Sequence, residues 1–432
     1  MLKLVLIADD LTGANDSGVQ FAKQGLNVHV FLENPSTGFG TDLPDVVVLD
    51  TDSRALPSEQ AAERIRATGK IIRTVGSARP MIFKKIDSTL RGNIGAEVDA
   101  AMAEYGLKWA AVAPAFPRNG RITVGGWHLL NQVPLAESEI ARDPKTPVHE
   151  SSVPQLLASQ SCHDVGHVDL SYVSRGLDAI QQRIGELRRQ EIRIISFDAS
   201  TADHLQAIAA ALATAPEPPL WVGCAGLAEM VPSVMGWTQQ HRIVNTETAG
   251  PVLVMAGSVS PVTARQMSQF LAGENSRLVS LRAEALLTDE TAELARCVGE
   301  AREGLSLGRD ILVASAVEAG AVAIAQAQGT SRGLDGRQVS EMVAAAMGKI
   351  VQELTALPLA GMFLTGGDTA VAVCRALGVG SIEILAEVLP GIPLGQLVGG
   401  WRPGLRVVTK AGAFGADTAI VESVRVLKGK EE

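Results

Sequence analysis

Charged and hydroxyl side chains gather after three short apolar runs in the first hundred residues. Each run is mostly apolar and only five or six residues long, which predicts a strand. Ligands bind beyond the carboxyl ends of the strands in an open parallel sheet, so these positions are the first candidates for chemistry. They are Asp9 and Asp10 after residues 3–8, Arg54 after residues 46–50, and Lys85, Asp87, Ser88, Thr89 and Arg91 around the end of residues 81–86.

These residue types suit a small anion that carries hydroxyl groups. Arg54 and Arg91 can each grip a carboxylate through two parallel N–H bonds, and Lys85 can hold a further oxygen. A carboxylate such as Asp10 or Asp87 can accept the proton of a reacting hydroxyl. The pattern therefore predicts a binding site for a hydroxylated acid, with a catalytic base in the same place.

Helix capping is the plainer explanation for some of the polar residues. Asn15 and Asp16 stand where a helix predicted over residues 16–24 begins, so capping and ligand binding explain them equally well. Asp9 and Asp10 directly follow a predicted buried strand, and capping of that helix does not account for them. We therefore assign these two aspartates to function: one of them can reach a ligand hydroxyl or a metal, and for the other a role limited to capping or hydrogen-bonding the turn stays open.

Three predicted strand ends in the C-terminal half carry turns rich in glycine. Such turns leave backbone N–H groups free at the start of a helix, which is where phosphates bind. One turn of this kind is weak support, but three in one half of the chain predict a nucleotide site. The candidate residues are Ser258 after residues 251–256, Thr365, Gly366, Gly367 and Asp368 at the end of residues 361–365, and Gly412 after residues 406–410.

Short apolar runs alternate with helical patterns along the chain, which predicts an α/β protein built from βαβ units. Because 432 residues exceed one compact core, we expect two domains, each with a mainly parallel sheet, and an active site in the cleft between them. The polar stretch 239–250 divides the chain into domains over residues 1–245 and 250–432. Residues 115–154 form an irregular insertion, with a predicted hairpin at 122–134 that turns at Gly125 and Gly126.

Composition excludes several classes of partner. The formal charge is −9 and only 4% of residues are aromatic, which disfavours a nucleic-acid binder. No apolar stretch reaches the roughly 18 residues that a membrane span needs. The apolar start of the chain ends at two aspartates and is too short for a signal peptide, so a cytoplasmic location is the default expectation.

Metal and cofactor motifs are weak or missing. The four cysteines are widely separated and predict neither a disulfide framework nor a zinc knuckle. His163 and His167 stand four residues apart, but Gly166 lies between them and no third ligand is near in sequence, which disfavours a metal site. The phosphate-binding sequence G-x-x-x-x-G-K-[ST] is absent, and no G-x-G-x-x-G follows a predicted strand.

The charged and glycine-rich segments together resemble the four-carbon acid sugar kinase family. The resemblance covers nearly the whole chain, with the motifs in the same order, and implies an N-terminal sugar-acid domain and a C-terminal ATP domain. It implies that Asp10, Arg54 and the loop at residues 85–89 bind the substrate, and that Ser258, residues 365–368 and Gly412 bind ATP. The segments that carry it are residues 7–16, 85–95, 257–258, 364–370 and 410–415.

This resemblance implies phosphorylation of the 4-hydroxyl of a four-carbon acid, for which D-threonate is the first choice and D-erythronate and 3-oxo-tetronate are alternatives. Mg²⁺ is expected to bridge the ATP phosphates, with Asp368 as a candidate ligand. Whether Asp10 or Asp87 is the base stays open, as do the substrate's stereochemistry and the number of metal ions. A homodimer is the general expectation for the assembly.

Two other functions compete with the kinase. A sugar-acid dehydrogenase is disfavoured because the dinucleotide fingerprint is missing. A non-catalytic sugar-acid sensor would need no ATP turnover, and the charged loops in both halves of the chain argue against it.

Overall fold

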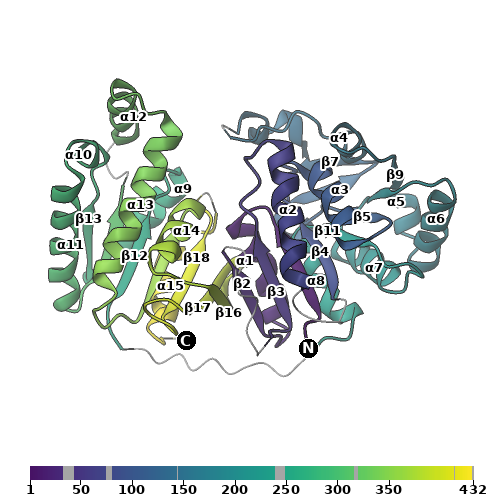
Figure 1. Cartoon of the computed structure of the whole chain (residues 1–432). Helices are drawn as coiled ribbons and strands as arrows, with labels where there is room; N and C mark the ends of the chain where they lie inside the picture. The colour runs from purple at the N-terminus through teal and green to yellow at the C-terminus, as the bar shows by residue number, and fades with distance from the viewer. Residues whose placement is uncertain are drawn as a thin grey trace. The chain divides into compact units, whose positions relative to one another are not determined.

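The computed structural model describes residues 1–32, 43–73, 80–143, 145–238, 249–315, 320–412 and 414–430. Within it the chain forms two compact units, Met1–His241 and Arg242–Glu432 (Figure 1). The predicted boundary near residue 245 lies outside the described residues. Both units are built from a mainly parallel sheet with helices packed on it, which confirms the predicted two-domain α/β class. No helix of the described ranges is long and apolar enough to cross a membrane.

The sheet of the first unit is parallel throughout, in the order β2-β3-β1-β4-β11-β5-β10-β9. Strand β1 lies between β3 and β4, so the order of the strands reverses there, and such a switch point is where ligands bind in open α/β sheets. The strands are β1 (Leu4–Ala8), β2 (Val28–Phe31), β3 (Val46–Asp50), β4 (Met81–Lys85), β5 (Ala110–Ala113), β9 (Val165–Val168), β10 (Ile194–Phe197) and β11 (Leu220–Gly223).

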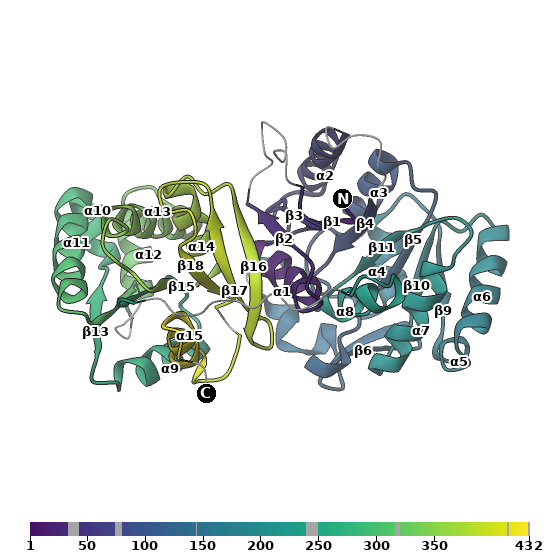
Figure 2. The same ribbon diagram turned by 90° about the horizontal axis from the view of Figure 1, so that it is seen from below.

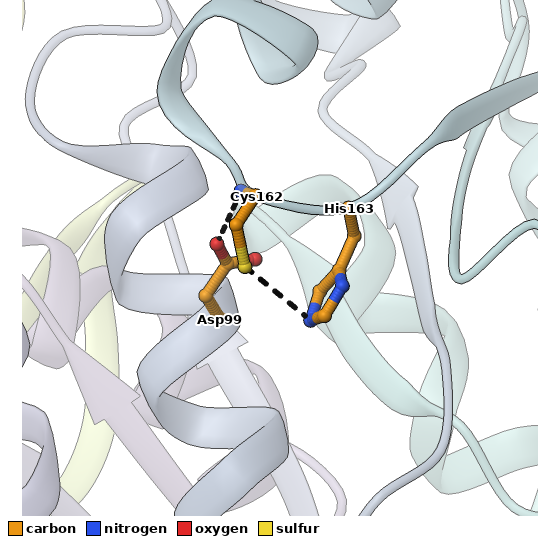
Figure 3. Close-up of side chains that lie close together, drawn as sticks. All are labelled: Asp99, Cys162 and His163. Carbon is orange, nitrogen blue, oxygen red and sulfur yellow. Dashed lines mark hydrogen bonds between the residues drawn. The ribbon is translucent and has the colours of Figure 1, made fainter.

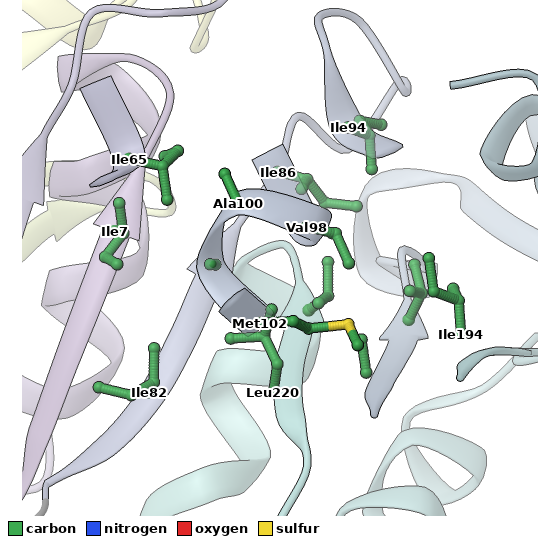
Figure 4. Packing of buried hydrophobic residues seen from close by; sticks show 14 of the residues in the cluster. Ile7, Ile65, Ile82, Ile86, Ile94, Val98, Ala100, Met102, Ile194 and Leu220 are labelled. Atoms are coloured by element: carbon green, nitrogen blue, oxygen red, sulfur yellow. The ribbon is translucent and has the colours of Figure 1, made fainter. Parts of the chain in front are cut away.

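Helices cover both faces of this sheet. Figure 2 shows α2 and α3 on one side of the strands and α1 and α8 on the other. Ile7 of β1 packs with Ile65 of α2 and Val98 of α3 in the core beneath the first pair (Figure 4). The helices are α1 (Leu11–Ala22), α2 (Ser58–Ile72), α3 (Ile94–Tyr105), α4 (Val153–Gln160), α5 (Leu170–Val173), α6 (Leu177–Arg189), α7 (Ala202–Ala213) and α8 (Ala225–Val234).

Helix α1 begins at Leu11, so the predicted start at Asp16 is wrong. The prediction gave too much weight to the low helix propensity of Gly13. Burial of Leu11 and a cap from Asp10 outweigh that propensity. The helix is nevertheless followed by Gly25 in the left-handed region, at φ 82°, as expected for a glycine after a helix C-terminus.

The insertion after β5 contains the predicted hairpin, formed by β6 (Arg121–Val124) and β7 (Trp127–Leu130). Gly125 and Gly126 both have positive φ, at 59° and 80°, which a two-residue turn of this kind requires. The backbone N–H groups of both glycines donate to the buried carboxylate of Asp198. Short elements complete the insertion: η2 (Pro117–Asn119), β8 (Val133–Pro134), η3 (Leu135–Glu137) and η4 (Glu139–Arg142).

The second unit has the sheet order β13-β14-β12-β15-β18-β17-β16. Its first five strands are parallel, whereas β17 runs antiparallel to β18 and β16, a hairpin that the sequence analysis does not predict. Strand β12 lies between β14 and β15, so the strand order reverses here as it does at β1. The strands are β12 (Val252–Ala256), β13 (Ser276–Ser280), β14 (Asp310–Ala314), β15 (Gly361–Thr365), β16 (Ser381–Leu389), β17 (Ile392–Val398) and β18 (Arg406–Lys410).

Helices also pack on both faces of the second sheet. Helices α9 and α15 pack against each other, and α13 packs against α11 and α14. Phe270 of α9, Phe363 of β15 and Ile420 of α15 belong to one buried core. The helices are α9 (Pro261–Leu271), α10 (Ala283–Thr288), α11 (Glu290–Ser306), α12 (Ala321–Ser331), α13 (Gly336–Leu354), α14 (Gly367–Ala376) and α15 (Ala419–Leu427).

Candidate active site

Three loops of the first unit meet at the carboxyl edge of its sheet. Ala8 at the end of β1 pairs in register with Asp50 of β3 on one side and with Lys85 of β4 on the other. The loops that follow these strands therefore start side by side. These loops, with Lys85 at the end of β4, carry all the predicted substrate-binding residues, which the fold brings to the switch point at β1.

Arg54 lies at the centre of this cluster. Its Nε and Nη2 donate to the two oxygens of Asp9 at 2.7 and 2.9 Å, and its Nη1 and Nη2 donate to Asp10 at 2.9 and 2.5 Å. A guanidinium has five N–H groups, so most of its donors are already used within the protein. Arg54 thus positions two carboxylates. The predicted contact, in which it donates two hydrogen bonds to a ligand carboxylate, would require these bonds to rearrange.

The two aspartates after β1 differ in access and in charge environment. Burial alone would raise the pKa of Asp9, but the nearby guanidinium of Arg54, together with Lys84 and Lys85, holds that pKa below its usual value. The side chain of Asp9 is 5% exposed, whereas that of Asp10 is 27% exposed. Of the two, Asp10 is the carboxylate that a ligand can reach.

Asp10 also caps helix α1, because its Oδ1 accepts a hydrogen bond of 3.0 Å from the backbone N–H of Gly13. The sequence analysis leaves open that one of the two aspartates caps the turn, but it does not predict that Asp10 caps this helix. The reason is the misplaced helix start, since the cap moves with the first turn. A capping carboxylate keeps free lone pairs, so the structural role leaves room for a ligand contact.

Asp87 is held by two arginines. Arg91 donates from Nε and Nη2 to the two oxygens of Asp87 at 2.8 and 3.1 Å, and Arg54 lies 3.8 Å away. Burial favours the neutral acid, but these cations outweigh it and keep the pKa of Asp87 well below its usual value. Arg91 is in turn anchored to Asp143 of the insertion at 3.0 Å. The Thr89 hydroxyl also donates to Asp87, so this loop is largely bonded to itself.

Lys85 differs from the other charged residues of this cluster in its contacts. Its side chain is buried, and its Nζ has no hydrogen-bond or ion-pair partner among the residues that the structure describes. A Cβ on Gly13 would lie 2.4 Å from Lys85 Nζ and 2.6 Å from Asp10 Oδ1, so only glycine leaves space for both groups. An ammonium that makes no direct contact with a carboxylate keeps its donors for a ligand, which marks this place as a binding site for an anion or a polar oxygen.

Lys84, which the sequence places next to Lys85, has a different role. Successive residues of a strand point to opposite faces, and Lys84 is fully buried against Glu97 of α3, with 2.8 Å between Nζ and Oε2. Glu97 also accepts from the Ser53 hydroxyl at 2.5 Å, and Ser53 directly precedes Arg54. The buried pair therefore fixes the loop that carries Arg54.

His128 of the insertion supports the loop after β4, which the sequence analysis does not anticipate. Its Nε2 lies 2.9 Å from the carbonyl oxygen of Ser88, which only accepts, so Nε2 carries the proton. The neutral ring then accepts at Nδ1 from the Thr123 hydroxyl at 2.8 Å. Burial lowers the pKa of His128 to about 4. Ser88 itself is partly exposed, and the histidine positions its backbone.

Stability should fall between pH 6.5 and pH 4 because His128 must stay neutral in the folded state. The unfolded chain takes up a proton near the ordinary pKa of 6.5, and the folded chain only near 4, so protons favour unfolding in this window. The loss approaches about 3 kcal/mol at the lower end. Urea unfolding of the wild type and of His128→Gln across this range tests it. The same pH dependence in both proteins would show that His128 contributes nothing.

The three glycine turns of the second unit are also neighbours, because Ala256 of β12 pairs with Thr365 of β15, and Thr365 pairs with Lys410 of β18. A Cβ on Gly412 would lie 2.1 Å from Ser258 Oγ. A Cβ on Gly257 would lie 2.0 Å from the Thr369 hydroxyl. The turns therefore pack so closely that a side chain on either glycine would collide with its neighbour at the start of α9 and α14. Of the third turn, Ala413 lies outside the described residues.

Single polar groups complete this second cluster. The Thr365 hydroxyl is buried and has no hydrogen-bond partner among the described residues. Gly366 has a φ of 103°, which favours glycine, and Asp368 is exposed in the first turn of α14. Lys410 Nζ donates to the carbonyl oxygens of Ala411, Gly412 and Phe414, and burial lowers the pKa of Lys410 to about 8. Lys410 thus shapes the third turn.

Comparison with known proteins agrees with this division of the chain. A family model described as a sugar-binding N-terminal domain matches residues 4–231, and one described as a nucleotide-binding C-terminal domain matches residues 253–420. A D-threonate kinase from Salmonella typhimurium is 37% identical over 428 residues, which are 98% of each chain. A D-erythronate kinase from Heliobacterium modesticaldum is 32% identical over 438 residues, 100% of this chain and 98% of that protein.

A solved structure from Salmonella typhimurium LT2 shares the fold, with a TM-score of 0.84 at 23% identity, covering 98% of this chain and 99% of that one. The two domain matches, the full-length relatives and the order of the motifs agree with one another. This chain belongs to the four-carbon acid sugar kinase family.

Proposed function

We propose that the chain is an ATP-dependent kinase that phosphorylates the 4-hydroxyl of D-threonate. The observation that carries the proposal is the pair formed by the accessible carboxylate of Asp10 and the ammonium of Lys85, which makes no hydrogen bond or ion pair with any described residue, both next to Gly13. The cation can hold the carboxylate of a sugar acid, and the base beside it can accept the proton of the hydroxyl that reacts. The higher identity to a D-threonate kinase than to a D-erythronate kinase supports the choice of substrate.

Phosphoryl transfer depends mainly on positioning and on neutralising charge, because the transferred group needs little covalent help. Lys85 holds an oxygen of the acid, and Asp10 accepts the proton of the attacking hydroxyl. Arg54 keeps Asp10 in place through two hydrogen bonds. Asp87 is the weaker candidate for the base, because its two arginine partners lower its pKa and occupy its oxygens.

The second unit supplies the ATP site in this proposal. Ser258, Gly412 and residues 365–368 offer backbone N–H groups and hydroxyls to the phosphates, and the unpartnered Thr365 hydroxyl fits a ligand oxygen. Mg²⁺ prefers oxygen ligands, so the exposed carboxylate of Asp368 suits it directly or through water. When bound, the ion neutralises charge on the phosphates.

Gly412→Ala should raise the KM for ATP about tenfold or more, which corresponds to about 1.4 kcal/mol of binding free energy. The new methyl group would collide with Ser258 and push the first turn away from the third. Gly299→Ala is the matched control, because this glycine lies within α11 and has open space around its Cβ position. ATP-dependent ADP release at saturating acid measures both. An unchanged KM in Gly412→Ala would remove this turn from the ATP site.

The substrate is tested by ADP release with Mg-ATP against D-threonate, L-threonate, D-erythronate, L-erythronate and 3-oxo-tetronate. We expect the highest kcat/KM with D-threonate, and a product phosphorylated at the 4-hydroxyl. A preference for one of the other acids would retain the kinase and overturn the substrate. Binding of acid and nucleotide without turnover of any acid would overturn the kinase and favour a sensor.

A further inference from the structure

A second cluster of reactive side chains lies on the outside of the first unit, apart from the residues assigned to the substrate. Asp99 projects from helix α3, and Cys162 and His163 belong to the link between α4 and β9. Figure 3 shows the Cys162 sulfur between the Asp99 carboxylate and the imidazole ring of His163. The chain thus brings together a thiol, an imidazole and a carboxylate from segments more than sixty residues apart.

The spacing of these groups suits one metal ion. One ligand atom from each residue lies within 4.8 Å of the other two, and the Cys162 sulfur is 3.9 Å from His163 Nε2. In a tetrahedral zinc site, Zn–S and Zn–N bonds of about 2.3 and 2.0 Å place sulfur and nitrogen about 3.5 Å apart. A small rotation of either side chain would bring both atoms onto one ion.

Hydrogen bonds already orient the candidate ligands. The Ser161 hydroxyl donates to Asp99 Oδ1 at 2.6 Å, and the backbone N–H of Cys162 donates to Asp99 Oδ2 at 2.8 Å. The same serine oxygen accepts from the backbone N–H of His163 at 3.0 Å. Each carboxylate oxygen keeps a further lone pair, and bonds of this kind hold carboxylate ligands in place in metal sites.

The start of the ligand-bearing link is fixed as well. Gln160 accepts from the backbone N–H of Gly95 at 3.0 Å and donates to the carbonyl oxygen of Gly92 at 3.3 Å. The link therefore holds its position on α3 without a metal. A site that is ordered before binding loses less entropy when the ion arrives.

Charge and access also favour a cation here. Asp99 makes no ion pair with any lysine or arginine in the described part of the chain. Cys162 is exposed, whereas Cys224, Cys297 and Cys374 are buried. An ion can therefore reach the thiol from solvent, with water completing its coordination.

We propose that Asp99, Cys162 and His163 bind a divalent cation that accepts sulfur and nitrogen ligands, with Zn²⁺ as the best match. Thiolate and imidazole select such metals, whereas Mg²⁺ takes oxygen ligands. The site is therefore separate in place and in metal preference from the one proposed for ATP. Binding releases the thiol proton, so affinity rises with pH.

The test is a titration of the reduced, chelator-treated full chain with Co²⁺, which reports thiolate ligation by a charge-transfer absorption band. We expect one Co²⁺ per chain and displacement of the band by Zn²⁺. Cys162→Ser should abolish the band, and Asp99→Asn and His163→Gln should each weaken binding by about tenfold or more. His149→Gln, which removes an exposed histidine of the same unit, is the control and should leave the titration unchanged.

Two results would overturn the site: no thiolate band in the wild type, or the same band in Cys162→Ser. The buried positions of the other three cysteines make the second comparison decisive, because they are not accessible to Co²⁺ in the folded chain. Thermal unfolding of each variant without metal shows whether it is folded. Kinase turnover is not used as a readout, so this outcome is independent of the proposed function.

Discussion

Lys85→Met is expected to lower kcat/KM for the acid by about 10²–10³, the range found when one group that stabilises developing charge is removed from an active site. The Lys85 side chain is buried and its ammonium makes no hydrogen bond or ion pair with any described residue, so its three donors remain for the acid in the proposed complex. Methionine fills a similar volume without the charge. Initial rates of ADP release, measured at varied concentrations of the acid and of ATP, give the loss in kcat/KM and show which of the two substrates it concerns.

A second variant tests the same contact by changing Gly13, the residue that lies against the Lys85 ammonium. Gly13→Ala places a Cβ 2.4 Å from Lys85 Nζ and should displace the ammonium, with a loss in the same direction. Lys108→Met is the matched control, because this lysine is 74% exposed and pairs with Glu217 on the surface. If Lys85→Met retained full kcat/KM, Lys85 would not bind the substrate, and the proposal would lose its main support.

Asp10→Asn should lower kcat by about 10²–10⁴ while the protein stays folded. Asparagine is as good a helix cap as aspartate, so the hydrogen bond to the N–H of Gly13 is retained. The amide oxygen can still accept from Arg54, but it cannot take up the hydroxyl proton. Turnover at saturating substrates, combined with thermal unfolding, separates the chemical role of Asp10 from its role as a cap.

Asp87→Asn gives the contrasting result. Removing this carboxylate deprives Arg91 of its bidentate partner and Arg54 of one nearby negative charge, so we expect lower stability and a higher KM for the acid, with kcat less affected than in Asp10→Asn. The opposite pattern, with kcat lost in Asp87→Asn and kept in Asp10→Asn, would transfer the role of base to Asp87. Near-normal turnover in both variants would show that neither is the base.

Much of the architecture is encoded locally and was predictable from the sequence. Short apolar runs identify β1, β3 and β4, because a strand buried on both faces has an almost continuous hydrophobic sequence. Ligands of parallel sheets bind at strand ends, so the residues that follow these runs were predicted as the site, and the fold brings them together at the switch point at β1. The glycine turns could also be recognised from the sequence, because close packing at a turn excludes side chains and so requires glycine.

The error at Asp10 shows where local reasoning stops. Residues 11–13 have a weak helical pattern, and the helix forms there because Leu11 is buried against the rest of the unit. Burial depends on which elements meet, and helix propensity does not contain that information. The cap on Asp10 and the space over Gly13 depend on the same packing.

Only the tertiary structure decided which charged side chains pair with one another. The sequence by itself determined that cations and carboxylates follow neighbouring strands, and that glycine turns follow three others. It did not show that Arg54 binds Asp9 and Asp10, or that His128 supports the loop after β4 from an insertion. Nor did it show that Asp99 meets Cys162 and His163. These contacts join residues that are far apart in the chain, and their distances are set by packing across the sheet, which no local pattern records.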